Sequence, residues 1–160
     1  MEGARLATRD DVARLADLVV EAIAEQATGR GGPVWSQREA RGVPAAASLE
    51  EAVADPDRFV VVGTINDVVV GFAAAHVEEL RNAELLGVVT DIYTEADARG
   101  VGVGEAMINE VLDWCRGRGC SGVDALALPG NRSTKNFFET FGFTARAIIV
   151  HRSLTGEAGA

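Results

Sequence analysis

Three glycines at alternate positions, Gly100, Gly102 and Gly104, follow Arg99 in the stretch "ARGVGVGEAM". The stretch lies where a strand-like run of residues gives way to a helical pattern. A helix N-terminus carries unpaired backbone N–H groups and a partial positive charge, and glycines let an anion approach them closely. The chemistry indicated by this pattern is therefore the binding of a phosphate-bearing molecule.

Two common phosphate-binding patterns do not fit this stretch. A Walker-type loop requires a lysine directly after its last glycine, and Glu105 follows Gly104 instead. The dinucleotide fingerprint G-x-G-x-x-G requires a third glycine, but the chain has Glu105 or Met107 there, depending on where the motif starts. The first pattern is excluded and the second is disfavoured.

A third pattern matches. The run from Arg99 to Gly104 resembles the R/Q-x-x-G-x-G/A signature of the GNAT superfamily of acyl-CoA-dependent N-acetyltransferases. Downstream, "NRSTKNFFETFGF" resembles the family's N-x-x-A-x-x-x-Y-x-x-x-G-F element. The residues in register with that element are Asn131, Thr134, Phe138, Gly142 and Phe143. Two motifs in the family's order make the resemblance specific, and it extends over essentially the whole chain.

The resemblance implies an α+β fold with a mixed, mostly antiparallel sheet of six or seven strands flanked by helices. Two central parallel strands, residues 88–94 and 123–128, would splay apart to admit the pantetheine arm of coenzyme A. Residues 1–154 would form a single domain, and residues 155–160 a flexible tail. The resemblance also favours a homodimer through the terminal strands.

The family's cofactor residues carry over to matching positions, with acetyl-CoA as the cofactor. The amides of the glycine stretch would hold the diphosphate, Arg99 would add positive charge, and the backbone of residues 92–94 would pair with pantetheine. Asn131 would hydrogen-bond the pantetheine, and three residues of the last helix would line the far wall. The complete set is Ile92, Tyr93, Thr94, Arg99, Gly100, Val101, Gly102, Val103, Gly104, Asn131, Thr134, Lys135 and Phe138.

Phe138 departs from the family pattern, because the family frequently has a tyrosine there that protonates the departing thiolate. A phenyl ring cannot donate a proton, and general-acid catalysis contributes about 10²–10⁴ in rate. A thiol with an ordinary pKa near 8.5 is nevertheless a tolerable leaving group unaided. The resemblance thus favours an N-acetyltransferase that acts on a primary amine by direct attack. The two alternatives are a non-catalytic acyl-CoA sensor and a structural domain that binds nothing.

An alkyl ammonium must lose a proton before it can attack a thioester. Asp91 and Tyr93 share one face of the strand expected at residues 88–94, so we expect either to act as catalytic residue, with Asp91 the first choice. The other interpretation of Asp91 is a carboxylate that anchors a neighbouring loop, and of Tyr93 a wall of the site. His76, Glu78 and Glu79 are reserve candidates.

Hydrophobic periodicity and turn signals predict the remaining elements. A Thr8–Asp11 capping box begins a helix that continues to Ile23, and a Ser48–Glu51 capping box begins a short helix. Asn66-Asp67 predicts a hairpin turn. A helix is expected from about Gly102, another ended by Gly142, and a final strand over residues 143–154, "FTARAIIVHRSL".

Trp35 lies in a segment rich in glycine and charge that reads as a loop with at most a short helical turn. A tryptophan in such a segment either closes the core or forms part of a substrate wall, and Trp35 is our candidate substrate contact. Together with the acidic surface it could clasp a cation.

The 160 residues carry a formal net charge of −9, which disfavours nucleic acid and anionic membrane surfaces as partners. The charge also favours an amine substrate, a small molecule or a peptide, although solubility alone explains it equally well. The spacing of Cys115 and Cys120 matches no zinc pattern, so no metal is expected. With no apolar run of about 20 residues and no secretory leader, a cytoplasmic location is expected.

Overall fold

Five strands form one mixed sheet in the computed structural model, which describes residues 1–156. The strands lie in chain order across the sheet, and only the last pair is parallel. Their bounds are β1 (Glu2–Leu6), β2 (Arg58–Ile65), β3 (Val68–Glu79), β4 (Leu85–Thr94) and β5 (Cys120–Ala125). The α+β class with a mixed, mostly antiparallel sheet, as predicted, is confirmed.

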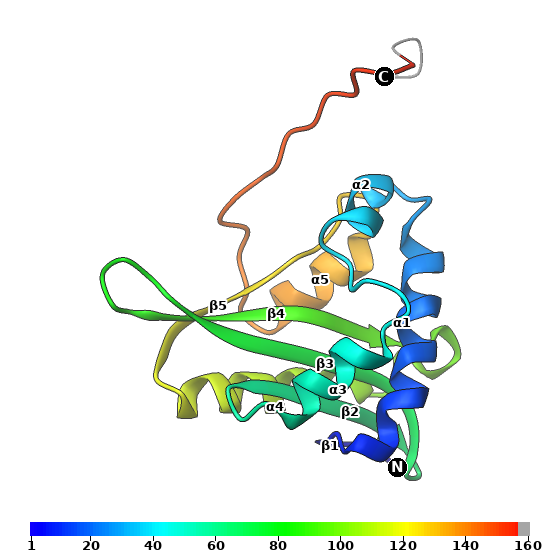
Figure 1. Cartoon of the computed structure of the whole chain (residues 1–160), viewed down its shortest axis with the longest axis vertical. Helices are drawn as coiled ribbons and strands as arrows, with labels where there is room; N and C mark the ends of the chain where they lie inside the picture. The colour runs from blue at the N-terminus through cyan, green and yellow to red at the C-terminus, as the bar shows by residue number, and fades with distance from the viewer. Residues whose placement is uncertain (157–160) are drawn as a thin grey trace.

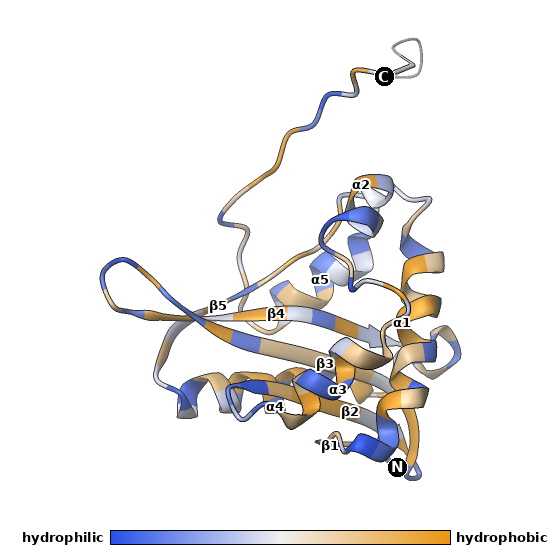
Figure 2. Ribbon diagram, viewed as in Figure 1, coloured by the Kyte–Doolittle hydropathy of each residue, from blue (hydrophilic) through white to orange (hydrophobic). Residues whose placement is uncertain are grey.

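Helices cover both faces of this sheet (Figure 1). They are α1 (Val12–Gln26), α2 (Gly32–Gln37), α3 (Ala46–Ala54), α4 (Val103–Gly117) and α5 (Arg132–Thr140), with 3₁₀ turns at Arg9–Asp11 and Ala96–Ala98. One apolar cluster joins α1 and α3 to one face of the sheet, and a second joins α4 and α5 to the opposite face. The buried residues of α1 are all apolar, and Figure 2 shows orange bands along this helix and along the central strands. Within the described residues, no helix is long and apolar enough to span a bilayer.

Local signals placed most boundaries correctly. The capping box at Thr8 and Asp11 is present, with the Thr8 amide donating to the Asp11 carboxylate over 2.8 Å. Asn66 and Asp67 both have positive φ, at 48° and 67°, as a two-residue hairpin turn between antiparallel strands requires. The Ser48 capping box is wrong, because α3 begins at Ala46 and the Ser48 hydroxyl donates back to the Ala45 carbonyl.

A β-bulge in β4 determines which side chains reach which face. Ala75 pairs with Val89 and Ala74 with Asp91, so Thr90 has no partner residue on β3. Val89 therefore packs in the α4 cluster, whereas Tyr93, two residues after Asp91, packs in the α1–α3 cluster. The extra residue thus turns Asp91 and Tyr93 to the α1–α3 face, and they share a face as predicted.

The two parallel strands separate, as predicted. β4 pairs with β5 only from Leu85↔Cys120 to Val89↔Ala125. Residues 90–94 of β4 continue beyond β5 and have no partner on that side within residues 1–156. The strands begin earlier than predicted, and β5 ends at Ala125 rather than Leu128. A stretch of backbone donors and acceptors is thereby left open beside the start of α4.

The predicted number of strands is not reached, because the described residues form five rather than six or seven. Residues 143–154, which were expected to form the final strand, form no strand within the described residues. β propensity makes a segment extended, but only a neighbouring strand makes it part of a sheet. Of the predicted flexible tail, residues 157–160 lie outside the described residues.

Candidate active site

The glycine stretch forms the N-terminus of α4. Gly102 is the N-cap, with φ of 96°, a left-handed conformation that residues with a side chain rarely adopt. The Ala106 amide donates to the Gly102 carbonyl, so the first-turn amides before it have no partner within the helix. The stretch therefore presents free N–H groups at the positive end of a 15-residue helix, as an anion site requires.

Gly104 has a different role from the other two glycines. A Cβ added there would lie 2.9 Å from the Phe137 ring, so the missing side chain lets α5 pack directly on α4. The atoms nearest to a Cβ added at Gly102 belong to the Glu2 side chain, the first at 3.3 Å. The motif thus combines a loop conformation at Gly102 with a helix contact at Gly104.

Arg99 is held by the end of α1. Its guanidinium donates to both carboxylate oxygens of Glu25, over 2.7 and 2.6 Å, and its Nε donates to the Thr94 carbonyl over 2.9 Å. The guanidinium also lies over the Tyr93 ring, 5.4 Å from the centroid. The hydrogen-bonded ion pair with Arg99 lowers the pKa of Glu25 and raises that of Arg99. Glu25 was not identified from the sequence, because 74 residues separate it from Arg99.

A cavity of about 230 Å³ lies beside this ion pair. It is bounded by the end of α1, by Arg99 and by the segment that leads into α5. Asn131, on that segment, caps α5 by accepting from the Thr134 amide at 3.1 Å, and its side-chain amide lies 3.4 Å from the Gln26 oxygen. The structure therefore brings Arg99 and Asn131, from the two sequence motifs, to one cavity.

The other two residues expected on the far wall differ in environment. Phe138 is buried in the α4 cluster, where its ring contacts Phe137 and Phe143 at centroid distances of 5.5 and 5.1 Å. Lys135 is exposed and lies 3.8 Å from Glu139 on the next turn of α5. Phe138 is thus fixed by core packing, whereas Lys135 lies on the surface.

At the bulge, Asp91 forms a two-pronged ion pair with Arg41. Arg41 donates through Nη2 and Nε over 2.6 and 3.1 Å, and both side chains are nearly buried, at 13% and 11% exposed. The Thr90 hydroxyl donates to the same carboxylate over 2.7 Å, and Arg41 donates to the Ser48 hydroxyl over 3.1 Å. Asp91 therefore does anchor the segment between α2 and α3, one of its two predicted roles, and Arg41 is a residue that the sequence analysis missed.

A second cavity, of about 300 Å³, opens at this ion pair. Its lining combines charges of both signs from segments far apart in the chain, among them Glu39, Arg41, Arg58, His76 and Asp91. His76 lies 2.9 Å from Glu78, which brings together two of the reserve candidates. The two cavities lie at opposite ends of residues 90–94, one beside Thr90 and Asp91 and the other beside Arg99, which contacts Thr94.

Tyr93 lies between these ends. Its pKa is raised, first by burial and then by the nearby carboxylates of Glu25 and Glu21. The phenol therefore stays protonated at neutral pH, and it is suited to donate a proton rather than to accept one.

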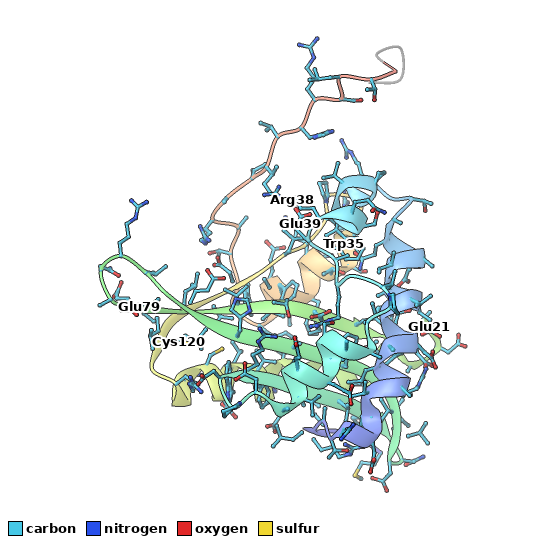
Figure 3. All side chains as sticks on the ribbon, viewed as in Figure 1. Glu21, Trp35, Arg38, Glu39, Glu79 and Cys120 are labelled. Carbon is cyan, nitrogen blue, oxygen red and sulfur yellow. The ribbon has the colours of Figure 1, made fainter. Side chains whose placement is uncertain are left out.

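Trp35 is part of α2 and is half-buried. It belongs to neither apolar cluster of the described residues, so its interpretation as a core plug is wrong. Its carbonyl accepts from the amides of Arg38, Glu39 and Ala40, which closes the end of α2. Figure 3 shows Trp35 near Arg38 and Glu39, away from the β3–β4 hairpin end that carries Glu79. The lining residues of the two cavities do not include it, and a substrate role for Trp35 stays a prediction.

Comparison with known proteins matches this geometry. The model of the acetyltransferase (GNAT) family matches residues 15–143. An uncharacterized N-acetyltransferase from Methanocaldococcus jannaschii is 29% identical over 97 residues, which cover 59% of this chain and 42% of that protein. The chain thus aligns with less than half the length of this curated relative.

Solved structures share the fold at low sequence identity. A tetramutant of the BH1408 protein from Bacillus halodurans gives a TM-score of 0.78 at 15% identity, over 94% of this chain and 99% of that one. Glucosamine-6-phosphate N-acetyltransferase from Arabidopsis thaliana gives 0.70 at 18% identity, over 96% and 99%. An aminoglycoside acetyltransferase from an uncultured soil metagenomic sample, solved with sisomicin, gives 0.70 at 17% identity, over 96% and 95%.

Proposed function

Because this chain belongs to the acetyltransferase (GNAT) family, we propose that it transfers the acetyl group of acetyl-CoA to a primary amine. The observation that carries the proposal is the separation of β4 from β5 next to the glycine-capped end of α4. This region combines an open strand edge with a helix N-terminus. The acyl donor has groups complementary to both.

Two groups of acetyl-CoA are complementary to the open strand edge and to the N-terminus of α4. Pantetheine is a chain with two amide groups. Residues 90–94 have no strand on the β5 side, so their backbone groups, apart from the Thr94 carbonyl that accepts from Arg99, can bind it as a strand edge binds a peptide. The diphosphate carries negative charge, which the free amides from Val101 to Gly104 and the end of α4 stabilise. Asn131, which lines the cavity beside Arg99, and Thr134, whose amide it caps, are assigned to the pantetheine arm in this proposal.

The acceptor amine, in this proposal, enters through the second cavity. That cavity lies at the bulge end of residues 90–94, opposite the diphosphate end. Its mixture of carboxylates and guanidinium groups favours a small polar amine over an apolar one. Two structural neighbours are named for an aminoglycoside and for glucosamine-6-phosphate, which are polar molecules that carry amines.

Acetyl-CoA supplies the acyl group, and its thiol is the leaving group. The residues of this chain must orient the amine, accept a proton from it and donate a proton to the departing thiolate. Deprotonating an ammonium with an ordinary pKa near 10.4 costs about 4.6 kcal/mol at pH 7. Holding two reactants in the right orientation lowers the activation barrier by roughly 7–11 kcal/mol, which exceeds the cost of deprotonation. We assign proton acceptance to Asp91, with its carboxylate held in place by Arg41, and proton donation to the Tyr93 hydroxyl in place of the tyrosine that Phe138 replaces.

The direct test is release of the CoA thiol from acetyl-CoA in the presence of a panel of polar amines. Turnover with at least one amine is expected, together with a rise in melting temperature when acetyl-CoA binds. A raised melting temperature without turnover on any amine would support the sensor alternative, which Phe138 favours. Absence of both effects would contradict acetyl-CoA binding altogether.

A further inference from the structure

The second cavity contains two arginines that differ in how far their donors are already used. Arg41 donates three hydrogen bonds, two to Asp91 and one to Ser48, and only 13% of its side chain is exposed. Arg58 also lines the cavity but is 47% exposed. Within the described residues its Nε lies 3.4 Å from the Asp55 carboxylate, and its Nη groups donate no hydrogen bond. Of the two arginines, Arg58 is therefore the one with donors available to a ligand.

Strand register places Arg58 on the face of the sheet that carries this cavity. Arg58 is the first residue of β2 and lies opposite His76 on β3. Val60, two residues further along β2, packs in the α1–α3 cluster, and alternate residues of a strand share a face. The helix α3 lies over this part of β2 and β3 (Figure 1). The base of the Arg58 side chain is thus fixed on the same face as Asp91.

Two carboxylates line the same cavity. Asp91 is held by its ion pair on β4, whereas Glu39 comes from the segment that follows α2. The Glu39 carboxylate is 31% exposed and lies 3.9 Å from Arg38, its neighbour in the chain (Figure 3). Carboxylates bind an ammonium group, and a guanidinium binds a carboxylate or a phosphate. The cavity therefore offers separate places for a positive and a negative group of one ligand.

The sheet sets the distance between these places. Asp91 pairs with Ala74, and Ala74 pairs with Val60. Arg58 lies two residues before Val60 on β2. Two strand spacings of ~4.8 Å and two residues of ~3.3 Å place the Cα atoms of Asp91 and Arg58 about 12 Å apart. Side chains stand roughly perpendicular to a sheet, so a ligand that contacts both needs its amine and its anion several bonds apart.

We propose that the acceptor carries an anionic group, a carboxylate or a phosphate, several bonds from its amine, and that Arg58 binds this group. The inference rests on the proposed function, because it concerns the acceptor of that reaction. The net charge of −9 repels anions in general, so an anion needs a local cation where it binds. The anionic group takes no part in acyl transfer, and Arg58 determines specificity.

The first test compares acceptors that differ only in the anionic group. One set is 6-aminohexanoate, 6-aminohexyl phosphate and the neutral 6-amino-1-hexanol. We expect kcat/KM of the wild-type protein to be at least about tenfold higher with an anionic member than with the amino alcohol, because that is the contribution of a hydrogen bond to a charged group. Glycine, whose amine and carboxylate share one carbon, should show no such preference over ethanolamine.

A substitution of Arg58 tests which residue binds the anion. Arg58→Gln removes the charge and keeps a polar side chain, and it should abolish the preference for the anionic amines. Arg116→Gln is the matched control, because Arg116 also forms an ion pair with an aspartate three residues before it, Asp113. Arg116 lies on α4, which packs against the opposite face of the sheet. Its substitution should leave the preference unchanged.

Three outcomes would overturn the inference. They are equal kcat/KM values for the anionic and neutral six-carbon amines, a preference that persists in Arg58→Gln, and an equal preference for glycine over ethanolamine. Each would leave the proposed function standing, because amines are still acetylated. If no amine is acetylated, the proposed function fails, and calorimetry of 6-aminohexanoate and 6-aminohexyl phosphate tests the anion site by itself. Binding that Arg58→Gln abolishes would support the site, and binding that is absent or unaffected by Arg58→Gln would overturn it.

Discussion

The two ends of residues 90–94 offer different kinds of groups to a ligand. At the Thr94 end, the groups suited to a ligand are backbone amides of one continuous stretch, Val101 to Gly104. At the Thr90 end, they are side chains from several segments, such as Arg41 before α3, His76 on β3 and Asp91 on β4. A backbone site needs particular residues in one local order, whereas a side-chain site needs only that distant segments meet. In the proposed function, the donor end is therefore the part that a local motif can specify, and the acceptor end is the part that only the fold assembles.

The largest effect is expected from a substitution at the proposed diphosphate site. Gly102→Asp places a side chain at a φ of 96° and adds a negative charge where the diphosphate is proposed to lie. We expect acetyl-CoA affinity to fall by more than about 100-fold, measured by calorimetry. Gly117→Asp makes the same change at the far end of α4, where an added Cβ meets no atom within 4 Å, and should keep the affinity. Retained affinity in Gly102→Asp would contradict the placement of the diphosphate.

The next substitutions test whether Asp91 accepts a proton or only anchors the segment that carries Arg41. Asp91→Asn is expected to lower kcat about 100-fold, the lower end of acid–base contributions, with little change in acetyl-CoA affinity. Arg41→Ala removes the same ion pair but keeps the carboxylate. Steady-state kinetics of both variants decides between the roles. Equal losses would show that Asp91 acts only as an anchor, and an unchanged rate in Asp91→Asn would remove it from the mechanism.

A smaller effect is expected between the two ends. Tyr93→Phe should lower kcat by about tenfold, because the phenol donates a proton to a thiolate that is already a tolerable leaving group. The raised pKa of Tyr93 keeps this donor protonated, so the wild-type rate should not fall between pH 7 and 9 through loss of its proton. A pH–rate profile of both proteins tests this.

The smallest effect concerns the ion pair that joins α1 to the donor end. Because Arg99 lowers the pKa of Glu25, this pair adds stability above the unfolded pKa of about 4.3, and the added stability is lost as the pH falls through the folded pKa. Both side chains are more than a third exposed, so the contribution is under about 1 kcal/mol. Urea unfolding should show Glu25→Gln less stable than wild type at pH 7, with a difference that shrinks as the pH is lowered below about 4.3. A difference that does not shrink on acidification would show that the pair's charge is not its source.

Local sequence determined a large part of this molecule. The α1 periodicity, the hairpin at Asn66-Asp67 and the loop before α4 were all predicted, because each depends on neighbouring residues in the chain. The two motifs also predicted the family and, with it, the separated parallel strands. The residue roles that the resemblance implied at these positions remain proposals.

Tertiary structure decided the rest. Glu25 meets Arg99 across 74 residues and Arg41 meets Asp91 across 50, and no periodicity or motif records such contacts. The number of strands was also not decided locally, since residues 143–154 have the composition of a strand but no strand partner among the described residues. A sequence determines the conformation that a segment prefers, because that preference comes from adjacent atoms. Which partner the segment finds depends on where the whole fold places a free edge.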